Sequence, residues 1–483
     1  MKPLLRILAA LAFAGMVAGG HESSAAQQAG PKNVILMEAD GSGANSIAAT
    51  GMYEGRRGKQ IFDSPEWIKT WISTYPLRTG TSPIAGPAGL AQDPDTLYDP
   101  AKNWDTTPVA TTTGRFPDHF AGYAWTKRTA PDSANTMSAV VNGHKSYNNA
   151  INVDGNGMKL TTFAERESGQ GKAVGVVTTV EFSDATPAAG GGTHNVSRLN
   201  HGEIAREMLT AGVVSVIMGT GNPDYDNDGM RRTTPDYAWI DAADWTALKS
   251  GTHPGGFKLI QDKADFDALT AAASPPKKLI GIARGFNSTQ FNRAGAEPAT
   301  EAPYAVPRRS DVPSLRTMVQ GALNILDDDP DGMFLVIEGG AVDRAEHADN
   351  IGRMIEERVE YDDAVAAVSA YLDADTNGNN WSNTLVILSA DHDHLLLGPD
   401  SDTVPFQDLV DKGKGRVPGY KWQNNSHSNN LVPLYARGPG ANLFAGCAKR
   451  RDAHTDGQGR SFGHGAYLDQ IEIFAVMTGL GCH

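Results

Sequence analysis

The sequence predicts an α/β fold with a large, mostly parallel central sheet that carries helices on both faces. Short apolar runs rich in β-branched residues recur along the chain, and segments with helical periodicity lie between them. Parallel strands covered on both faces read as continuous apolar runs, because crossover helices bury each side of the sheet. We expect five such strands, at 33–37, 172–178, 213–218, 333–337 and 384–388.

Helices are expected between these strands where apolar residues return every three or four positions. The clearest case is 349–373, where Ile351, Met354, Ile355 and Val359 share one face and acidic residues lie elsewhere. The remaining helices are expected at about 133–144, 200–210 and 313–326.

Two long stretches lack this periodicity. Residues 76–128 are rich in Gly, Pro, Thr and Asp, and residues 222–308 carry Pro, Gly and charge between weaker patterns. The sequence contains no internal repeat and no linker long enough to separate two domains. We therefore expect a single domain over 27–483, with loop-rich insertions near these two stretches.

The first residues, 1–26, are typical of a secretory signal peptide. Lys2 and Arg6 precede an apolar run over 7–17, and small residues follow at 24–26. The run is too short to cross a bilayer and no stop-transfer pattern follows it, which argues against the alternative of a membrane anchor. We expect a mature chain without a membrane span, in a periplasmic or secreted location.

Cysteine usage agrees with export but leaves two alternatives. The chain contains 2 cysteines, Cys447 and Cys482, both near its end. In a cytosolic protein they would be buried thiols, whereas in an exported protein a disulfide that fixes the C-terminus is favoured. Neither has the neighbours that a catalytic or zinc-binding thiolate needs.

The formal net charge of −14 argues against nucleic acid or an anionic membrane as a partner. It also constrains any site that handles a multiply charged anion, because strong local positive charge must be supplied against an acidic background. Metal ions are a compact way to supply that charge.

Acidic residues follow three of the expected strands at the point where each strand ends. Asp40, Glu338 and Asp391 occupy these positions. In open α/β sheets, sites are built at the carboxyl ends of the strands. The sequence therefore predicts one acidic site at this edge of the sheet.

Two motifs add histidines to these carboxylates. Asp343 and His347 are four residues apart, so on a helix they share a face and could bind one metal ion; the alternative is an ordinary exposed helical turn. The run Asp391-His-Asp-His394 comes directly after a strand. Imidazoles and carboxylates are costly to pack at a strand end unless a cation compensates them.

Ser133 opens the expected helix at 133–144 and has two interpretations. A serine at a helix N-terminus is usually an N-cap. The functional alternative is a nucleophile whose hydroxyl is deprotonated by a bound metal, where the helix dipole and backbone amides favour a phosphate.

In their order and spacing these motifs resemble the alkaline phosphatase family, of the bacterial secreted type that shares its core with the mammalian enzymes. The resemblance runs from about residue 32 to 438 and is weakest in the two insertions. The matching segments are 40–43, Asp132-Ser133-Ala134, 143–148, 176–179 with 184–187, Arg198, Glu338 through His347, Asp391-His392, and His427-Ser428 with 431–436.

The resemblance implies an exported, metal-dependent phosphate monoester hydrolase that forms a phosphoserine intermediate on Ser133. Small phosphate monoesters would be its substrates, and the family is often dimeric. Arg198 would bind two phosphate oxygens in the bidentate manner of a guanidinium, and Asp132 would hold that arginine in place.

The resemblance also implies two zinc ions and one magnesium ion. Charge stabilisation and in-line placement are the main requirements of phosphoryl transfer, and two metals meet both. The implied ligands are Asp343, His347 and His427 for one zinc; Asp40, Asp391 and His392 for the other; and Asp40, Thr186 and Glu338 for the magnesium.

Three residues are implied to lie around these ligands. Asp184 would reach the magnesium through water, and its presence favours magnesium over a third zinc. His394 would hydrogen-bond a zinc ligand from outside. Arg344, which follows Asp343, stands where family members carry Lys, His or Trp.

The sequence departs from the family pattern near the expected nucleophile and the phosphate-binding arginine. Pro131 stands where the family usually has Thr, and Glu38-Ala39 replaces an apolar-Gly pair. Arg198 lies one residue further from Asp184 than in the best-known bacterial enzyme.

Two acidic loops, 224–229 and 373–378, and three alternative functions complete the expectations. Asp224, Asp226 and Asp228 have the spacing of half a calcium loop but lack its final Glu, so we interpret them as a turn, with a structural calcium as the alternative. The alternative functions are a phosphodiesterase or a sulfatase of the same superfamily, or an exported metal-binding protein without activity.

Overall fold

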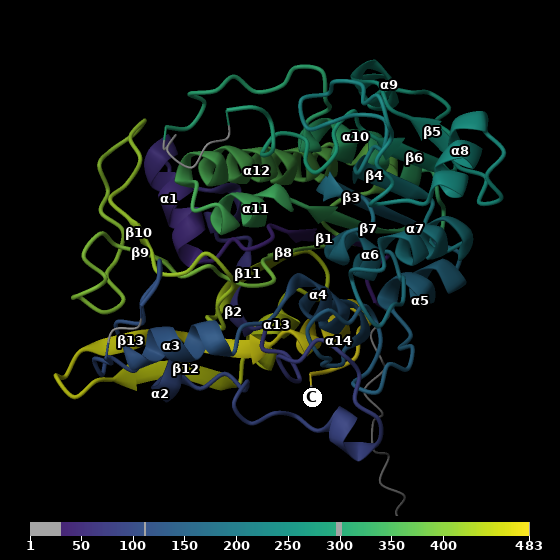
Figure 1. Cartoon of the computed structure of the whole chain (residues 1–483). Helices are drawn as coiled ribbons and strands as arrows, with labels where there is room; N and C mark the ends of the chain where they lie inside the picture. The colour runs from purple at the N-terminus through teal and green to yellow at the C-terminus, as the bar shows by residue number, and fades with distance from the viewer. Residues whose placement is uncertain (1–29, 111–112, 296–301, 483) are drawn as a thin grey trace, which may run out of the picture.

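The computed structural model describes residues 30–110, 113–295 and 302–482. Its centre is an 11-stranded sheet in the order β12-β13-β2-β11-β8-β1-β7-β3-β4-β6-β5 (Figure 1). The predicted α/β class with a large, mostly parallel sheet is confirmed. The segment expected to be a signal peptide, 1–26, lies outside the described residues.

The five predicted strands are all present in this sheet. They are β1 (Asn33–Glu38), β3 (Ala173–Glu181), β4 (Val216–Thr220), β7 (Met333–Glu338) and β8 (Thr384–Ser389). β1 pairs in parallel with β7 on one side and with β8 on the other. β3 pairs in parallel with both β7 and β4. The carboxyl ends of these strands therefore meet at one edge.

One strand begins later than predicted. The apolar run starts at Val213, but β4 begins at Val216; Gly212, with a φ of +77°, turns the chain before the run. The neighbouring β3 instead continues three residues past its predicted end, as far as Glu181.

The sequence pattern did not predict the remaining strands of the sheet as a group, because most of them are short or lie at its edges. The outer pair β12–β13 is half exposed, so it lacks the continuous apolar run of a buried strand. These strands are β2 (Ile68–Ser73), β5 (Lys258–Ile260), β6 (Leu279–Ile282), β11 (Val432–Arg437), β12 (Arg450–Thr455) and β13 (Ser461–Asp469); a separate pair is β9 (Leu396–Leu397) and β10 (Lys421–Trp422).

Helices cover both faces of the sheet (Figure 1). The predicted helices are found as α4 (Ser133–Asn142), α7 (His201–Thr210), α10 (Leu315–Leu326) and α12 (Ile351–Asp373). The others are α1 (Ala44–Glu54), α2 (Pro100–Asn103), α3 (Ala121–Arg128), α5 (Phe163–Gly169), α6 (Ala185–Gly190), α8 (Ala242–Ser250), α9 (Lys263–Leu269), α11 (Ala341–His347), α13 (Leu443–Cys447) and α14 (Ile471–Met477).

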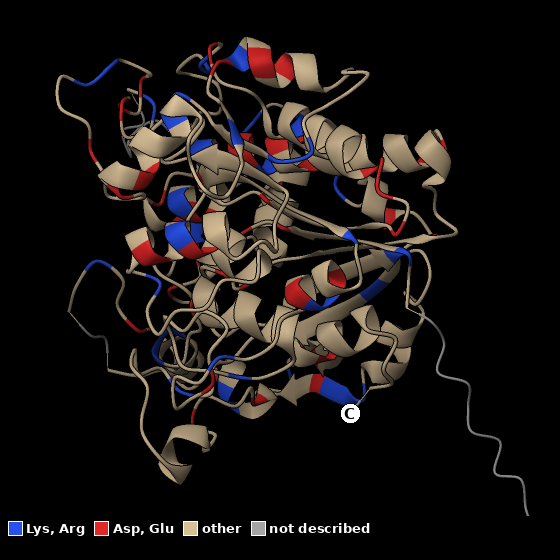
Figure 2. Cartoon of the chain, turned by 90° about the vertical axis from the view of Figure 1, so that its right-hand side faces the viewer, with Lys and Arg blue, Asp and Glu red and all other residues tan. Residues whose placement is uncertain are grey.

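The alternation of side chains along β1 separates the interior into two layers. Val34 and Leu36 point to a core shared with α4, α7 and α14, whereas Ile35 and Met37 point to a core shared with α10 and α12. All four side chains are buried. Figure 2 shows that the central strands carry few charged residues and that most charged residues lie on the surrounding helices and loops.

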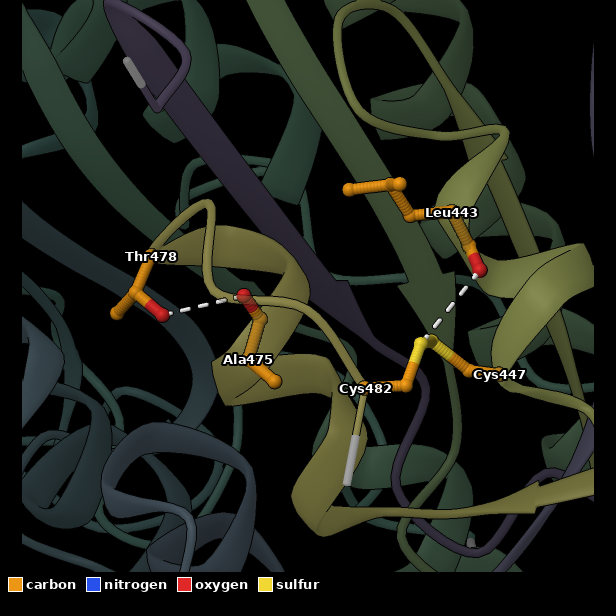
Figure 3. The surroundings of a disulfide bond; sticks show 5 residues. All are labelled: Leu443, Cys447, Ala475, Thr478 and Cys482. Carbon is orange, nitrogen blue, oxygen red and sulfur yellow. Dashed lines mark hydrogen bonds between the residues drawn. A yellow bond between two sulfur atoms is a disulfide. The ribbon is translucent and has the colours of Figure 1, made fainter. Parts of the chain in front are cut away.

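A disulfide joins Cys447, the last residue of α13, to Cys482 beyond α14 (Figure 3). The expected cross-link is therefore present. Its Cα atoms are 5.4 Å apart and the two cysteines are 35 residues apart in sequence. The closed loop contains β12, β13 and α14, so the bond ties the edge of the sheet to the C-terminus.

Removing this disulfide should lower the free energy of unfolding by about 2–4 kcal/mol, because the cross-link restricts the unfolded chain. We expect a reducing agent to lower the melting temperature of the wild-type protein. The double variant Cys447→Ser/Cys482→Ser should melt at the reduced value and show no further response to the reducing agent. A wild-type melting temperature that does not change on reduction would contradict this expectation.

Candidate functional site

Acidic residues follow four neighbouring parallel strands at the edge where their carboxyl ends meet. Asp40 lies just past β1, Glu338 is the last residue of β7, and Asp391 lies just past β8. Asp184 follows β3 and is the N-cap residue of α6. The parallel pairing of these strands brings Asp40, Glu338 and Asp391 to one edge, as the strand pattern predicts, and it adds Asp184, which only the family resemblance implied.

The first group of possible metal ligands consists of Asp40, Asp391 and His392. His392 Nε2 lies 2.9 Å from Asp391 Oδ2 and 3.4 Å from Asp40 Oδ1. One ligand atom from each residue lies within 4.8 Å of the others, and all three side chains are buried. Gly41 has a φ of +74° and donates its N–H to Asp391 Oδ1 at 2.9 Å, so the turn after β1 itself positions a carboxylate.

The second group surrounds Asp343 Oδ1. Asp343 lies in the first turn of α11 and His347 is its last residue, while His427 comes from the loop before β11. The Nε2 atoms of His347, His394 and His427 lie 3.4, 2.7 and 3.5 Å from Asp343 Oδ1. The structure thus brings together the three residues expected at one zinc, and it places His394 closest to their shared carboxylate.

Ser133 is the first residue of α4, and the preceding Asp132 is its N-cap. Asp132 Oδ1 accepts the N–H of Asn135 at 3.1 Å, so the capping role belongs to Asp132 and the interpretation of Ser133 as the cap is wrong. The Ser133 hydroxyl remains available, and its Oγ lies 3.4 Å from His392 Nε2.

The Arg198 guanidinium lies between two carboxylates of the site. Its Nη1 is 3.4 Å from Asp132 Oδ2 and its Nη2 is 3.0 Å from Asp184 Oδ1. The chain between Asp184 and Arg198 turns at Gly192, which has a φ of +81°. The extra residue in this segment therefore does not keep the arginine away from Ser133 and its helix.

Arg344 occupies the other side of Asp184. Its Nη2 donates to Asp184 Oδ2 at 2.6 Å and to Glu181 Oε2 at 2.9 Å. Glu181 is fully buried at the end of β3 and was not identified from the sequence, although its position at a strand end was the available signal. Two arginines and the three carboxylates of Asp132, Asp184 and Glu181 thus form a connected network along one side of the site.

Burial dominates the electrostatics of the carboxylates at the strand ends. Burial, together with the Asp391 carboxylate, raises the pKa of Asp40 well above its usual value. Burial raises the pKa of Glu338 to about 8, and nearby Asp184 and Asp391 add to the shift. Glu38, inside β1 and beside Glu338 in the sheet, is raised in pKa for the same reason. These carboxyls are under strong mutual repulsion.

Other groups have their charge stabilised by close partners. Burial alone would raise the pKa of Asp184, but the Arg198 and Arg344 guanidiniums outweigh it and hold that pKa below its usual value.

Burial lowers the pKa of both His392 and His394, which favours neutral imidazoles. Neutral imidazole and ionised carboxylate are the forms that bind metal ions.

Several buried oxygens of the site have no hydrogen-bond partner among the described residues. They include Asp40 Oδ1 and the Thr186 hydroxyl. A buried polar atom without a partner is costly, and a bound cation would satisfy these oxygens and relieve the repulsion between carboxylates. The donor sets suit such ions: nitrogen and carboxylate oxygen fit zinc, whereas the oxygens of Asp40, Thr186 and Glu338 fit magnesium.

Comparison with known proteins agrees with this geometry. The family model of alkaline phosphatase matches residues 104–408. The chain belongs to the alkaline phosphatase family. It is 27% identical over 362 residues to the alkaline phosphatase of Escherichia coli, and the aligned region covers 69% of this chain and 75% of that enzyme. It is 26% identical over 418 residues to alkaline phosphatase 4 of Bacillus subtilis, covering 74% and 83% of the two chains.

Solved alkaline phosphatases share the fold. The enzyme of the Antarctic bacterium TAB5 aligns with a TM-score of 0.58 at 20% identity, covering 93% of this chain and 97% of that chain. The Thermus thermophilus enzyme aligns with a TM-score of 0.59 at 18% identity, covering 97% and 96%. The relatives and the family model together support alkaline phosphatase activity, a hydrolase activity, for this chain.

The acidic loop considered for calcium is held by protein groups. Asp224 Oδ2 accepts from the Lys249 ammonium at 2.9 Å, and Asp226 Oδ1 accepts the N–H groups of Asp228 and Met230. These aspartates do not appear among the clusters of described residues whose ligand atoms converge on one point. The geometry favours a turn stabilised by its own side chains.

The described part of the chain also bears on the membrane question. Among residues 30–110, 113–295 and 302–482, no helix combines the length and the apolar character needed to cross a bilayer.

Removal of bound metal should destabilise this enzyme. The buried carboxylates would lose their compensating charge, so we expect a chelator to lower the free energy of unfolding by at least about 3 kcal/mol. Thermal melts before and after chelation, with metal content measured on the same samples, test this. Adding back zinc and magnesium should restore the melting temperature, and a stripped protein that melts like the untreated one would contradict the expectation.

Proposed function

We propose that the chain is an exported phosphate monoester hydrolase that works through a phosphoserine on Ser133 with two zinc ions and one magnesium ion. The observation that carries the proposal is the position of the Ser133 hydroxyl. It lies at the N-terminus of α4, 3.4 Å from His392 Nε2, and the Arg198 guanidinium contacts the adjacent residue Asp132 at 3.4 Å. Export is supported by the character of residues 1–26 and by the disulfide.

The metal ions are assigned to the donor sets of the site. When bound, they supply the positive charge that stabilises the attacking and leaving oxygens and lowers the pKa of the attacking hydroxyl. A solved variant of the TAB5 enzyme is described with Mg bound in its M3 site, which supports a third ion in this family. The assignment is Asp343, His347 and His427 for one zinc; Asp40, Asp391 and His392 for the other; and Asp40, Thr186 and Glu338 for magnesium, with Asp184 beside it.

In the proposed reaction, the Ser133 oxygen attacks the phosphorus atom of the ester. The bond between phosphorus and the alcohol oxygen breaks, and the alcohol leaves with a proton. A water molecule then attacks the same phosphorus from the opposite side of the serine, which regains its proton as inorganic phosphate leaves. Two in-line displacements give retention of configuration at phosphorus.

Arg198 is proposed to bind two oxygens of the phosphoryl group. Asp132 and Asp184 hold its guanidinium from two sides, so its orientation is fixed before the substrate arrives. The N-terminus of α4 adds backbone N–H groups that favour an anion at the same place. His394, at 2.7 Å from Asp343 Oδ1, is proposed to hold that carboxylate in position.

The change Ser133→Ala should lower kcat on nitrophenyl phosphate by on the order of 10³-fold or more, because the covalent route is lost. Metal content and melting temperature should stay near the wild-type values. The matched control is Ser138→Ala on the same helix, whose hydroxyl bonds the Ala150 carbonyl away from the site. Its activity should remain, and a Ser133→Ala enzyme that keeps full activity would refute the proposed nucleophile.

Rates on three nitrophenyl esters distinguish the related activities. We expect nitrophenyl phosphate to be hydrolysed faster than bis-nitrophenyl phosphate or nitrophenyl sulfate, because Arg198 and the metal ions match the charge of a phosphate monoester dianion. Faster hydrolysis of the diester would identify a phosphodiesterase, and faster hydrolysis of the sulfate a sulfatase.

The change Arg198→Ala should raise KM for nitrophenyl phosphate by about 10- to 100-fold, since two charge-assisted hydrogen bonds are lost. Arg198→Lys keeps the charge but not the planar fork, so it should recover only part of the loss. Arg206→Ala serves as the control, because this exposed arginine pairs with Asp241 and Asp244 on the surface. Equal KM values for Arg198→Ala and the control would count against the assignment.

A further inference from the structure

A cavity separate from the candidate active site is lined by Asp393, the residue between His392 and His394. Its volume is about 420 Å³, and its lining includes Asp393, Trp104, Phe406, Phe462, His464 and Asp408. The rings come from distant parts of the chain, so the fold assembles this cavity from the insertion at 76–128, the segment after β9, and β13. None of these side chains has a role in the proposed phosphoryl transfer.

The aromatic walls are held in fixed positions. The Trp104 indole donates its Nε1–H to Asp452 Oδ1 at 2.8 Å, and the Asp452 carboxylate is buried. Phe406 meets the Trp104 ring edge-on at 4.8 Å between ring centroids, and Phe462 lies nearly parallel to it at 5.7 Å. The same Asp452 accepts the backbone N–H of His464 at 2.7 Å, which fixes the fourth ring.

The charge of the cavity is negative. The Asp393 carboxylate is 6% exposed, and its Oδ2 accepts only neutral donors: Leu395 N at 2.7 Å, Ser428 Oγ at 2.8 Å and Asn430 Nδ2 at 2.9 Å. Asp408 is exposed at the same cavity. Among the described residues, no Lys or Arg lines the cavity.

Groups next to the cavity change how strongly its negative charge acts. The Asp393 carboxylate lies against Gly43, which precedes α1, so the helix dipole stabilises part of its charge. Burial lowers the pKa of His464, so its ring is neutral at neutral pH and acts as a wall of the cavity instead of a competing cation. The Arg460 guanidinium lies 5.7 Å from the centroid of the Phe462 ring, but Asp456 pairs with it at 2.7 Å. The cavity therefore keeps the two carboxylates of Asp393 and Asp408 beside half-buried aromatic rings.

We propose that this cavity binds a small alkylated ammonium ion. Electron-rich ring faces attract a cation that is too weakly hydrated to prefer water, and nearby carboxylates add a long-range attraction. A metal ion does not fit this chemistry, because Asp393 and Asp408 do not appear among the groups of described residues whose ligand atoms converge on one point. An anion is excluded by Asp393 and Asp408. The trimethylammonium group of choline has the required size, charge and apolar surface.

Calorimetric titration of the full-length mature enzyme with choline tests the proposal. The matched probe is 3,3-dimethyl-1-butanol, which has the same shape as choline but carries no charge. We expect saturable binding of choline, and we expect the neutral probe to bind at least about fivefold more weakly. This difference in affinity measures the contribution of the positive charge of choline. Equal affinity for the two compounds, or no saturable binding of choline up to about 50 mM, would overturn the proposal.

Two variants and one control locate the binding. Asp408→Asn should weaken choline binding about threefold, since this exposed carboxylate lies at the cavity. Trp104→Leu should weaken it further by removing a ring, with the melting temperature measured to show that the variant folds. Asp411→Asn, on the same loop but outside the lining, should bind choline like the wild type. Binding that is unchanged in both Asp408→Asn and Trp104→Leu would place choline elsewhere and refute the site.

Discussion

The concentration of buried carboxylates at one edge of the sheet is the constraint on which the rest of this structure depends. Asp40, Glu338, Asp391 and Asp184 are brought within reach of one another by parallel strand pairing, in a chain whose net charge is already −14. Such a group is stable only if cations neutralise it. Arg198 and Arg344 neutralise part of this negative charge on the side of Asp184. The remaining carboxylate oxygens are those assigned to metal ions in the proposed function.

The short helices at this edge combine structural and chemical roles. Asp132 caps α4 and also contacts Arg198, while Asp184 caps α6 and contacts both arginines. The side chains that begin these helices therefore also orient the guanidinium proposed to bind phosphate. Because Asp132 takes the capping position, the hydroxyl of the next residue does not have to satisfy the backbone.

Much of the site could be predicted because its residues follow local rules. Buried strands are visible as apolar runs, and acidic residues at their ends mark Asp40, Glu338 and Asp391. The positions that could not be predicted depend on tertiary contacts. The sequence did not reveal Glu181, since its importance comes from Arg344 across the site, and it did not show that the longer segment before Arg198 would still reach Asp132. The half-exposed edge strands also lack the apolar pattern that identified the central ones.

The position of β1 in the sheet has a consequence for how the molecule forms. The first strand of the chain lies between β7 and β8, and the Asn33 side chain accepts the N–H of Met333 across 300 residues of sequence. Contacts this distant require a large loss of chain entropy before they form, and they slow folding. The nascent N-terminal strand must therefore wait for most of the chain before its partners exist. Until then its apolar edges are exposed to wrong pairing, so assembly of the core is a late and concerted event.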